Sequence, residues 1–253
     1  MTHPVLWQFR FSHFNEKARW ALDFKGIPHV RRSLLPGLHI PRVMWLTGQK
    51  AVPVLVVNGR AIADSTRIIA TLEQLQPDPR LYPKDEASRQ RALELEEFFD
   101  EELGPHIRRA FFYELLPDSD AAPALFAVGT SPTTQRLYRL LFPAIRAAMR
   151  MDMQIDAAHA EASRAKVAAA VDRLEAEIGQ SGYLVGETFT VADLTAAALF
   201  APLVFPPEFP YQPPVPLPET AQRLRQSFAG RRVLDWITTT YRRHRGHSTA
   251  VNE

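Results

Sequence analysis

One hydroxyl side chain, Ser12, lies at the junction between a short apolar run and a segment with helical periodicity. The first backbone N–H groups of a helix have no intrahelical partner, and the helix dipole favours negative charge beside them. A thiolate placed next to such a serine would therefore be stabilised. An ordinary helix N-cap, in which the serine oxygen accepts a backbone N–H, explains the same position. Position alone leaves both interpretations open.

The pair Asp64-Ser65 precedes a second helical segment. Ser65 and its N–H group could hold an α-carboxylate, and the carboxylate of Asp64 could accept an ammonium group. Together they suit the head group of a free amino acid. The alternative is a helix cap, the ordinary role of these residue types before a helix.

A proline, Pro53, opens the β-branched run 53–57 and removes one donor from the ladder of a sheet. That loss is tolerable if the carbonyl and N–H groups of the preceding Val52 face a ligand, and a cis peptide bond would expose them in this way. The alternative is a trans proline that begins an edge strand, which is the commoner case.

Composition limits the chemistry further. The chain has no cysteine, which excludes disulfides, thiolate metal sites and a cysteine nucleophile, so thiol chemistry needs a borrowed thiol. Thirty basic and twenty-eight acidic residues leave a charge of only +2, which indicates no nucleic-acid partner. The start lacks a secretory pattern, and the longest apolar run, 194–205, falls short of the ~20 residues that span a bilayer. We expect a cytoplasmic protein with no membrane partner.

The elements that must position these residues fall into two halves. Strand and helix patterns follow the order βαβ and then ββα, with a tight hairpin at Asn58-Gly59. Three prolines in residues 77–83 indicate a stiff linker. We therefore predict a first domain over 1–77, a linker over 78–83 and an all-α second domain over 84–253. The expected helices of the second domain cover roughly 85–114, 132–155, 158–179, 191–201, 219–229 and 231–245.

Three segments show no sustained pattern. Residues 36–49 read as irregular with one helical turn, and residues 117–131 read as a long loop. Eight prolines in residues 202–218 argue against a helix there.

Four segments, read together, resemble a known family: 12–19 (SHFNEKAR), 51–55 (AVPVL), 62–65 (IADS) and 188–193 (TFTVAD). Their order and spacing are similar to those of cytosolic glutathione S-transferases with a serine-type site, as in the tau, theta and zeta classes. The resemblance implies an α+β fold in which a thioredoxin-like βαβ-ββα domain precedes a helical bundle. His13 replaces the proline that usually follows the serine.

The resemblance also implies a role for each matching residue. Ser12 would donate to the glutathione sulfur, and Val52, before a cis Pro53, would pair its backbone with the cysteinyl unit. Asp64 and Ser65 would hold the γ-glutamyl end. Lys50 would lie near the glycine carboxylate, although a solvated surface charge explains it equally well.

Other residues have weaker assignments. Arg19 either braces the site through an ion pair or lies on the surface. His106 and Tyr113 are candidates for the substrate pocket, although aromatic and histidine side chains at helical spacing are more often core. Thr190 and Asp193 form a reciprocal helix cap, a structural role.

By this resemblance the chain is a glutathione transferase, or a glutathione-dependent isomerase, lyase or peroxidase, of the kind that serves detoxification. Glutathione would be the co-substrate, a small hydrophobic electrophile the acceptor, and no metal would take part. The family also implies a homodimer. The alternative is a glutathione-binding or scaffold protein of the same fold without turnover.

Overall fold

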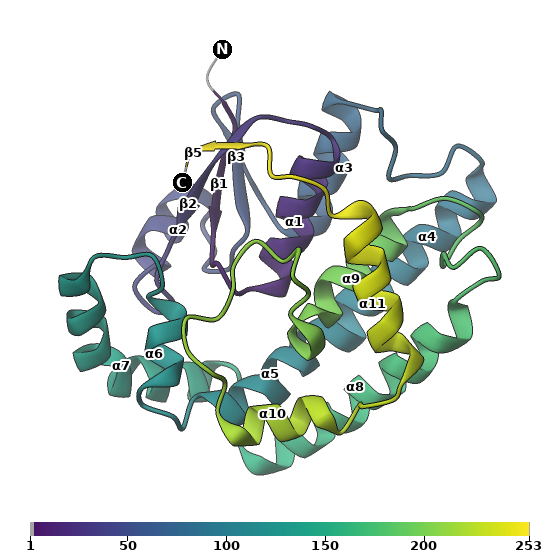
Figure 1. Cartoon of the computed structure of the whole chain (residues 1–253). Coiled ribbons are helices and arrows are strands. Elements are labelled where there is room, and N and C mark those ends of the chain that lie inside the picture. Colours follow the sequence, from purple (N-terminus) through teal and green to yellow (C-terminus); the bar gives the residue numbers. More distant parts are fainter. Residues whose placement is uncertain (1–2, 253) are drawn as a thin grey trace.

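The computed structural model describes residues 3–252 (Figure 1). Its sheet has the strand order β4-β3-β1-β2-β5. β1 (Val5–Gln8) pairs in parallel with β2 (His29–Ser33) and antiparallel with β3 (Val54–Val57), which forms a hairpin with β4 (Arg60–Ala63). The hairpin turns through Asn58 and Gly59, whose φ angles of 51° and 76° fit the turn expected from this dipeptide.

Three helices flank this sheet. α1 (His13–Phe24) and α3 (Ser65–Leu75) pack side by side on one face, and α2 (Ile40–Thr47) lies on the other (Figure 1). α2 has eight residues, so the expectation of a single helical turn in 36–49 was wrong. The apolar residues there do not show a face long enough to reveal the helix.

The rest of the chain is mainly helical. The elements are α4 (Glu86–Phe98), a π-helical turn η1 (Phe99–Leu103), α5 (Gly104–Leu115), α6 (Ala121–Phe126), α7 (Pro132–Asp152), α8 (Ala157–Glu177), α9 (Val191–Val204), α10 (Glu219–Gln226) and α11 (Arg232–His244). The expected thioredoxin-like half and helical half are thus confirmed. The boundary at 78–83 stays a prediction.

The centre of the core is α9, which is apolar on all sides and buried from Val191 to Leu203. It packs against α1, α4 and α11, so it joins the sheet half to the helical half. Thr190 and Asp193 form the predicted capping box at its start. Since the cap fixes the first turn of α9, it fixes the helix on which α1 rests.

Several local expectations differ from the structure. α9 continues through Pro202 to Val204, because a proline in the last turn removes one ladder bond while the burial of its neighbours is kept. The predicted loop 117–131 contains the short helix α6.

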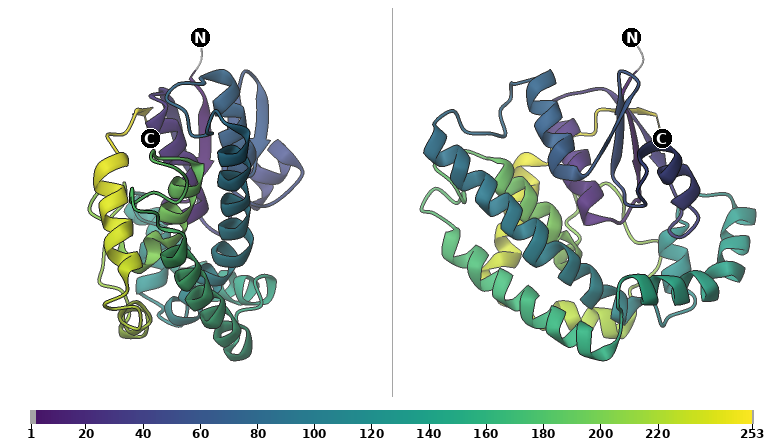
Figure 2. Two further views of the ribbon diagram at one scale, coloured as in Figure 1. Left: turned by 90° about the vertical axis from the view of Figure 1, so that its right-hand side faces the viewer. Right: turned by 180° about the vertical axis from the view of Figure 1, so that it is seen from behind.

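A fifth strand, β5 (Ala250–Asn252), pairs in parallel with β2. The expectation of an all-α second domain over 84–253 was wrong here, because three residues carry too short a pattern to indicate a strand. In both views of Figure 2 the chain returns from the end of α11 to the sheet. Within residues 3–252 no helix has both the length and the apolar character needed to cross a membrane.

Candidate active site at the start of helix α1

Ser12 caps α1. Its oxygen accepts a hydrogen bond from the backbone N–H of Asn15, 3.4 Å away, and its backbone is extended, as an N-cap requires. The cap interpretation is therefore confirmed, and it is compatible with chemistry. A hydroxyl that accepts through its oxygen keeps its own proton to donate, and Ser12 is only half-buried.

The loop before Ser12 is tied to Val52. The side-chain oxygen of Asn15 accepts from the N–H of Phe9 at 3.3 Å, and its amide nitrogen lies 3.5 Å from the carbonyl oxygen of Val52. The Val52–Pro53 bond is cis, as expected from the family pattern. The buried Asn15 thus connects the Ser12 loop with the residue proposed to meet a cysteinyl backbone.

His13 points away from this loop and into the protein. Its Nε2 donates to the carbonyl oxygen of Gly104 at 3.0 Å, and burial, helped by the charge of Arg108, lowers its pKa to about 3. Gly104 lets α5 approach closely, since a Cβ there would lie 2.3 Å from the ring of Phe14. His13 is therefore a neutral contact between α1 and α5.

Asp64 and Ser65 begin α3. The exposed Asp64 has a φ of 80°, and one of its carboxylate oxygens accepts the N–H groups of Thr66 and Arg67 at 3.0 and 3.1 Å. A positive φ is uncommon for a residue other than glycine and often marks a functional site. Asp64 is therefore a helix cap held in an unusual conformation, with Ser65 buried beside it.

Lys50 forms an ion pair with Asp152 at the end of α7. Both side chains are about half exposed, 56% and 46%, so the pair contributes little stability. The solvated-charge interpretation fits this placement.

The two candidates on α5 have contacts with α8. Nδ1 of His106 is 3.2 Å from the hydroxyl of Ser163, and the guanidinium of Arg164 lies 5.5 Å from the ring centre of Tyr113. These contacts lie between two helices of the bundle, α5 and α8, and do not join either side chain to Ser12. Their pocket role stays a prediction.

A fully buried arginine, Arg19, holds the Ser12 loop. Its guanidinium donates to the carbonyl oxygens of Phe9 at 3.1 Å, Arg10 at 3.0 Å and Ser12 at 3.5 Å. Its Nε pairs with Glu16 at 2.7 Å. The bracing interpretation of Arg19 is confirmed and the surface interpretation was wrong. The sequence pattern around Arg19 indicates a helix but does not show which way this side chain faces.

A second buried cation, Lys17, joins α1 to α3. It pairs with Glu96 at 2.7 Å and Asp100 at 2.5 Å, and Asp100 also accepts from the hydroxyl of Thr66 at 2.7 Å. Burial lowers the pKa of Lys17, but the two carboxylates raise it more, so the ammonium stays charged. This network fixes the first turn of α3, where Asp64 and Ser65 lie.

The proline-rich segment covers the other side of the Ser12 loop. The ring of Phe11 lies 6.3 Å from Phe205, 6.5 Å from Phe209 and 6.3 Å from Tyr211, and Gln8 donates to the hydroxyl of Tyr211 at 2.8 Å. Prolines stiffen the segment that presents these rings. The segment had no role assigned from its sequence, and it forms an aromatic wall around Phe11, the residue before Ser12.

Comparisons with known proteins agree with this architecture. Residues 6–80 match the family model for the glutathione S-transferase N-terminal domain, and residues 157–239 match that for its C-terminal domain. Among curated proteins, 91 residues are 32% identical to a probable maleylacetoacetate isomerase of Caenorhabditis elegans, covering 35% of this chain and 42% of that protein. A probable glutathione S-transferase of Solanum tuberosum is 27% identical over 115 residues, 44% of this chain and 52% of that protein. The chain thus spans about half the length of the curated relatives it matches.

Solved structures share the fold over nearly the whole length. A possible glutathione S-transferase from Rhodopseudomonas palustris has a TM-score of 0.65 at 17% identity, with 98% of each chain covered. A bacterial maleyl pyruvate isomerase, a zeta-class glutathione S-transferase, has a TM-score of 0.61 at 20% identity, with 95% of each chain covered. Since both domain models match in order and the fold agrees, the chain belongs to the glutathione S-transferase family.

Proposed function

We propose that this protein is a glutathione-dependent enzyme in which Ser12 activates the glutathione thiol. The observation that carries the proposal is the geometry of Ser12, which caps α1 through its oxygen and keeps its proton free to donate. A free thiol has a pKa of about 8.5 and is mostly protonated at neutral pH. A hydroxyl donor and the start of a helix both favour the thiolate.

The neighbouring groups supply a place for the rest of the tripeptide. The backbone of Val52, before the cis Pro53, would pair with the cysteinyl unit. Ser65 and the start of α3 would take the γ-glutamyl carboxylate, and Asp64 its ammonium. Lys50 would attract the glycine carboxylate in exchange for Asp152.

The acceptor is a small hydrophobic electrophile. The aromatic wall of Phe11, Phe205, Phe209 and Tyr211 supports this class, because it gathers apolar rings around the residue that precedes Ser12. The thiolate would attack an electrophilic carbon, or add to it reversibly and leave again, as an isomerase requires. The names of the Caenorhabditis elegans relative and of the zeta-class structure favour testing isomerisation alongside transfer. His106 and Tyr113 remain candidates for a more distant part of the pocket.

The family resemblance also leads us to propose a cytoplasmic homodimer with a role in detoxification. Isologous pairing is the commonest arrangement of soluble oligomers. Sedimentation at micromolar concentration measures the dimer directly, and a monomer alone would contradict it.

A single set of measurements separates enzyme from scaffold. Calorimetric titration with glutathione measures binding, and a screen of aromatic halides, epoxides, peroxides, aryl ethers and maleyl diacids measures turnover. Binding with turnover supports the enzyme, binding without turnover favours the scaffold, and absence of binding rejects both.

A further inference from the structure

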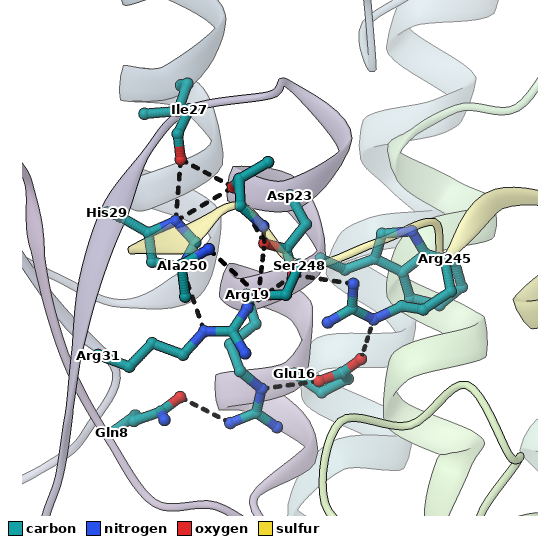
Figure 3. Close-up of polar contacts among 12 residues, drawn as sticks. Gln8, Glu16, Arg19, Asp23, Ile27, His29, Arg31, Arg245, Ser248 and Ala250 are labelled. Atoms are coloured by element: carbon teal, nitrogen blue, oxygen red, sulfur yellow. Dashed lines mark hydrogen bonds and ion pairs between the residues drawn. The ribbon is translucent and has the colours of Figure 1, made fainter. Parts of the chain in front are cut away.

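Arg245, the first residue after α11, is joined through the carboxylate of Glu16 to Arg19 (Figure 3), and Arg19 holds the Ser12 loop. Its Nε pairs with one oxygen of Glu16 at 2.6 Å, and the other oxygen of Glu16 pairs with Nε of Arg19 at 2.7 Å. Arg19 then donates to the carbonyl oxygens of the loop. Residues 229 positions apart in sequence thus form one buried chain of contacts.

The same arginine has a second branch. Nη1 of Arg245 pairs with Asp23 at 2.9 Å, and Asp23 also pairs with Arg31 at 2.7 Å and accepts the N–H of Thr249 at 2.8 Å. This branch anchors β2 and the C-terminal residues and does not lead to Ser12. The two branches allow the charge effect at the site to be separated from the anchoring of the tail.

The arginines of the two branches are buried and share their carboxylates. Three guanidinium groups, those of Arg19, Arg31 and Arg245, pair with two carboxylates, those of Glu16 and Asp23, and a third carboxylate, that of Glu208, lies close enough to act on the neighbouring Tyr241. Removing charges from water is costly, so the buried guanidinium groups act strongly on any neighbouring group that can become an anion. Because Glu16 is shared between two arginines, it neutralises Arg19 only in part.

We propose that Arg245, by sharing Glu16, is a positioning residue that leaves part of the positive charge of Arg19 available to stabilise an anion at Ser12. This inference rests on the proposed function, because the anion is the glutathione thiolate. Removal of Arg245 would leave Glu16 to neutralise Arg19 alone. Removal of the charge of Glu16 would have the opposite effect.

Other charged or titratable groups surround the two ends of this series of contacts, and the test variants leave those groups unchanged. Near Arg19 and Arg245 they come from α1, β2, α11 and the proline-rich segment, and near the Ser12 loop from the loop, α1 and α5. They are Asp23, His29, Arg31, Glu208 and Tyr241 in the first group, and Arg10, His13 and Arg108 in the second.

The experiment measures the pKa of the bound glutathione thiol from the ultraviolet absorbance of the thiolate and from the acid limb of the pH–rate profile. Arg245→Met should raise the pKa of the bound thiol by about half to one unit. At pH values below that pKa, the reaction should then be about three- to ten-fold slower. Glu16→Gln should lower the thiol pKa by a similar amount. Arg245→Lys, which keeps the charge, should stay close to the wild type.

Thr249→Val is the matched control, because it removes hydroxyl contacts of the tail with Asp23 and Ile27 and changes no charge. It should leave the thiol pKa unchanged even if it lowers the melting temperature. General damage cannot produce opposite shifts in Arg245→Met and Glu16→Gln, since both lose stabilising contacts.

Shifts in the same direction, or none, in folded variants would overturn the inference. If Arg245→Met does not fold, the inference is tested by the other two variants. It then requires a lowered thiol pKa in Glu16→Gln and an unchanged thiol pKa in Arg245→Lys. If the wild type shows no thiolate, the proposed function fails as well. If Ser12→Ala raises the thiol pKa while the Arg245 and Glu16 variants do not change it, only the present inference fails.

Discussion

Nε2 of His13 donates a hydrogen bond to the carbonyl oxygen of Gly104, 3.0 Å away, and so holds the start of α1 against the start of α5. The imidazole is buried and its pKa is lowered to about 3 by that burial and by Arg108. Where the family usually has a proline, this chain therefore has a neutral donor that faces the helical half. Ser12 remains the proposed hydrogen-bond donor to the thiol.

The buried imidazole predicts a pH dependence of stability. The folded pKa of about 3 lies below the ordinary value of 6.5, so between these values the unfolded state binds the proton and stability falls as the pH falls. At pH 5 this loss is about 2 kcal/mol relative to pH 7.5. His13→Gln keeps a donor for Gly104 but does not titrate. Urea unfolding at the two pH values should show a smaller loss in the variant, and equal losses would contradict the assignment.

Ser12→Ala should slow conjugation at pH 7 by about ten-fold or more, because a hydrogen bond to a charged group contributes about 1.5–3 kcal/mol. Glutathione affinity should fall less, since the γ-glutamyl and backbone contacts remain. The defect should shrink as the pH approaches the pKa of the free thiol, because the thiol then ionises without help from the protein. Full activity of the variant at pH 7 would mean that a backbone N–H, and not Ser12, donates to the glutathione sulfur.

Asp64→Ala should weaken glutathione binding about ten-fold and destabilise the fold by about 1 kcal/mol, because it removes both an ammonium partner and a helix cap. Asp85→Ala is the matched control. Asp85 caps α4 through the N–H of Ser88 at 2.8 Å in the same way and has no proposed ligand. Calorimetry and thermal unfolding should show equal stability losses but a loss of affinity only for Asp64. If the Asp64→Ala and Asp85→Ala variants bind glutathione with equal affinity, Asp64 acts only as a helix cap.

Asp193→Ala should destabilise the fold by about 3 kcal/mol or more. The carboxylate is fully buried and accepts the N–H of Leu184 at 2.8 Å and the N–H and hydroxyl of Thr190, both at 2.9 Å. Its loss leaves three buried donors without an acceptor. Chemical denaturation measures this, and a change below about 1 kcal/mol would mean that water replaces the cap.

Local sequence was enough for much of the fold. The Asn58-Gly59 turn, the cap at Ser12 and the reciprocal cap of Thr190 and Asp193 all form between residues no more than three apart. Such contacts depend on residue type and spacing, which the sequence displays directly. The helices of the second half followed from apolar spacing for the same reason, and the family pattern added the cis bond before Pro53.

Tertiary structure decided which polar residues face inward. Nothing near Arg19 in the sequence showed that it would be buried against the Ser12 loop, or that Glu16 would be shared with Arg245 at the far end of the chain. The same holds for His13 on Gly104 and for β5 beside β2. The contacts of Glu16 with Arg245, of His13 with Gly104 and of β5 with β2 each join segments far apart in the sequence. Sequence therefore determined the individual caps and helices, while the packing of distant segments determined which charged side chains are buried beside the Ser12 loop.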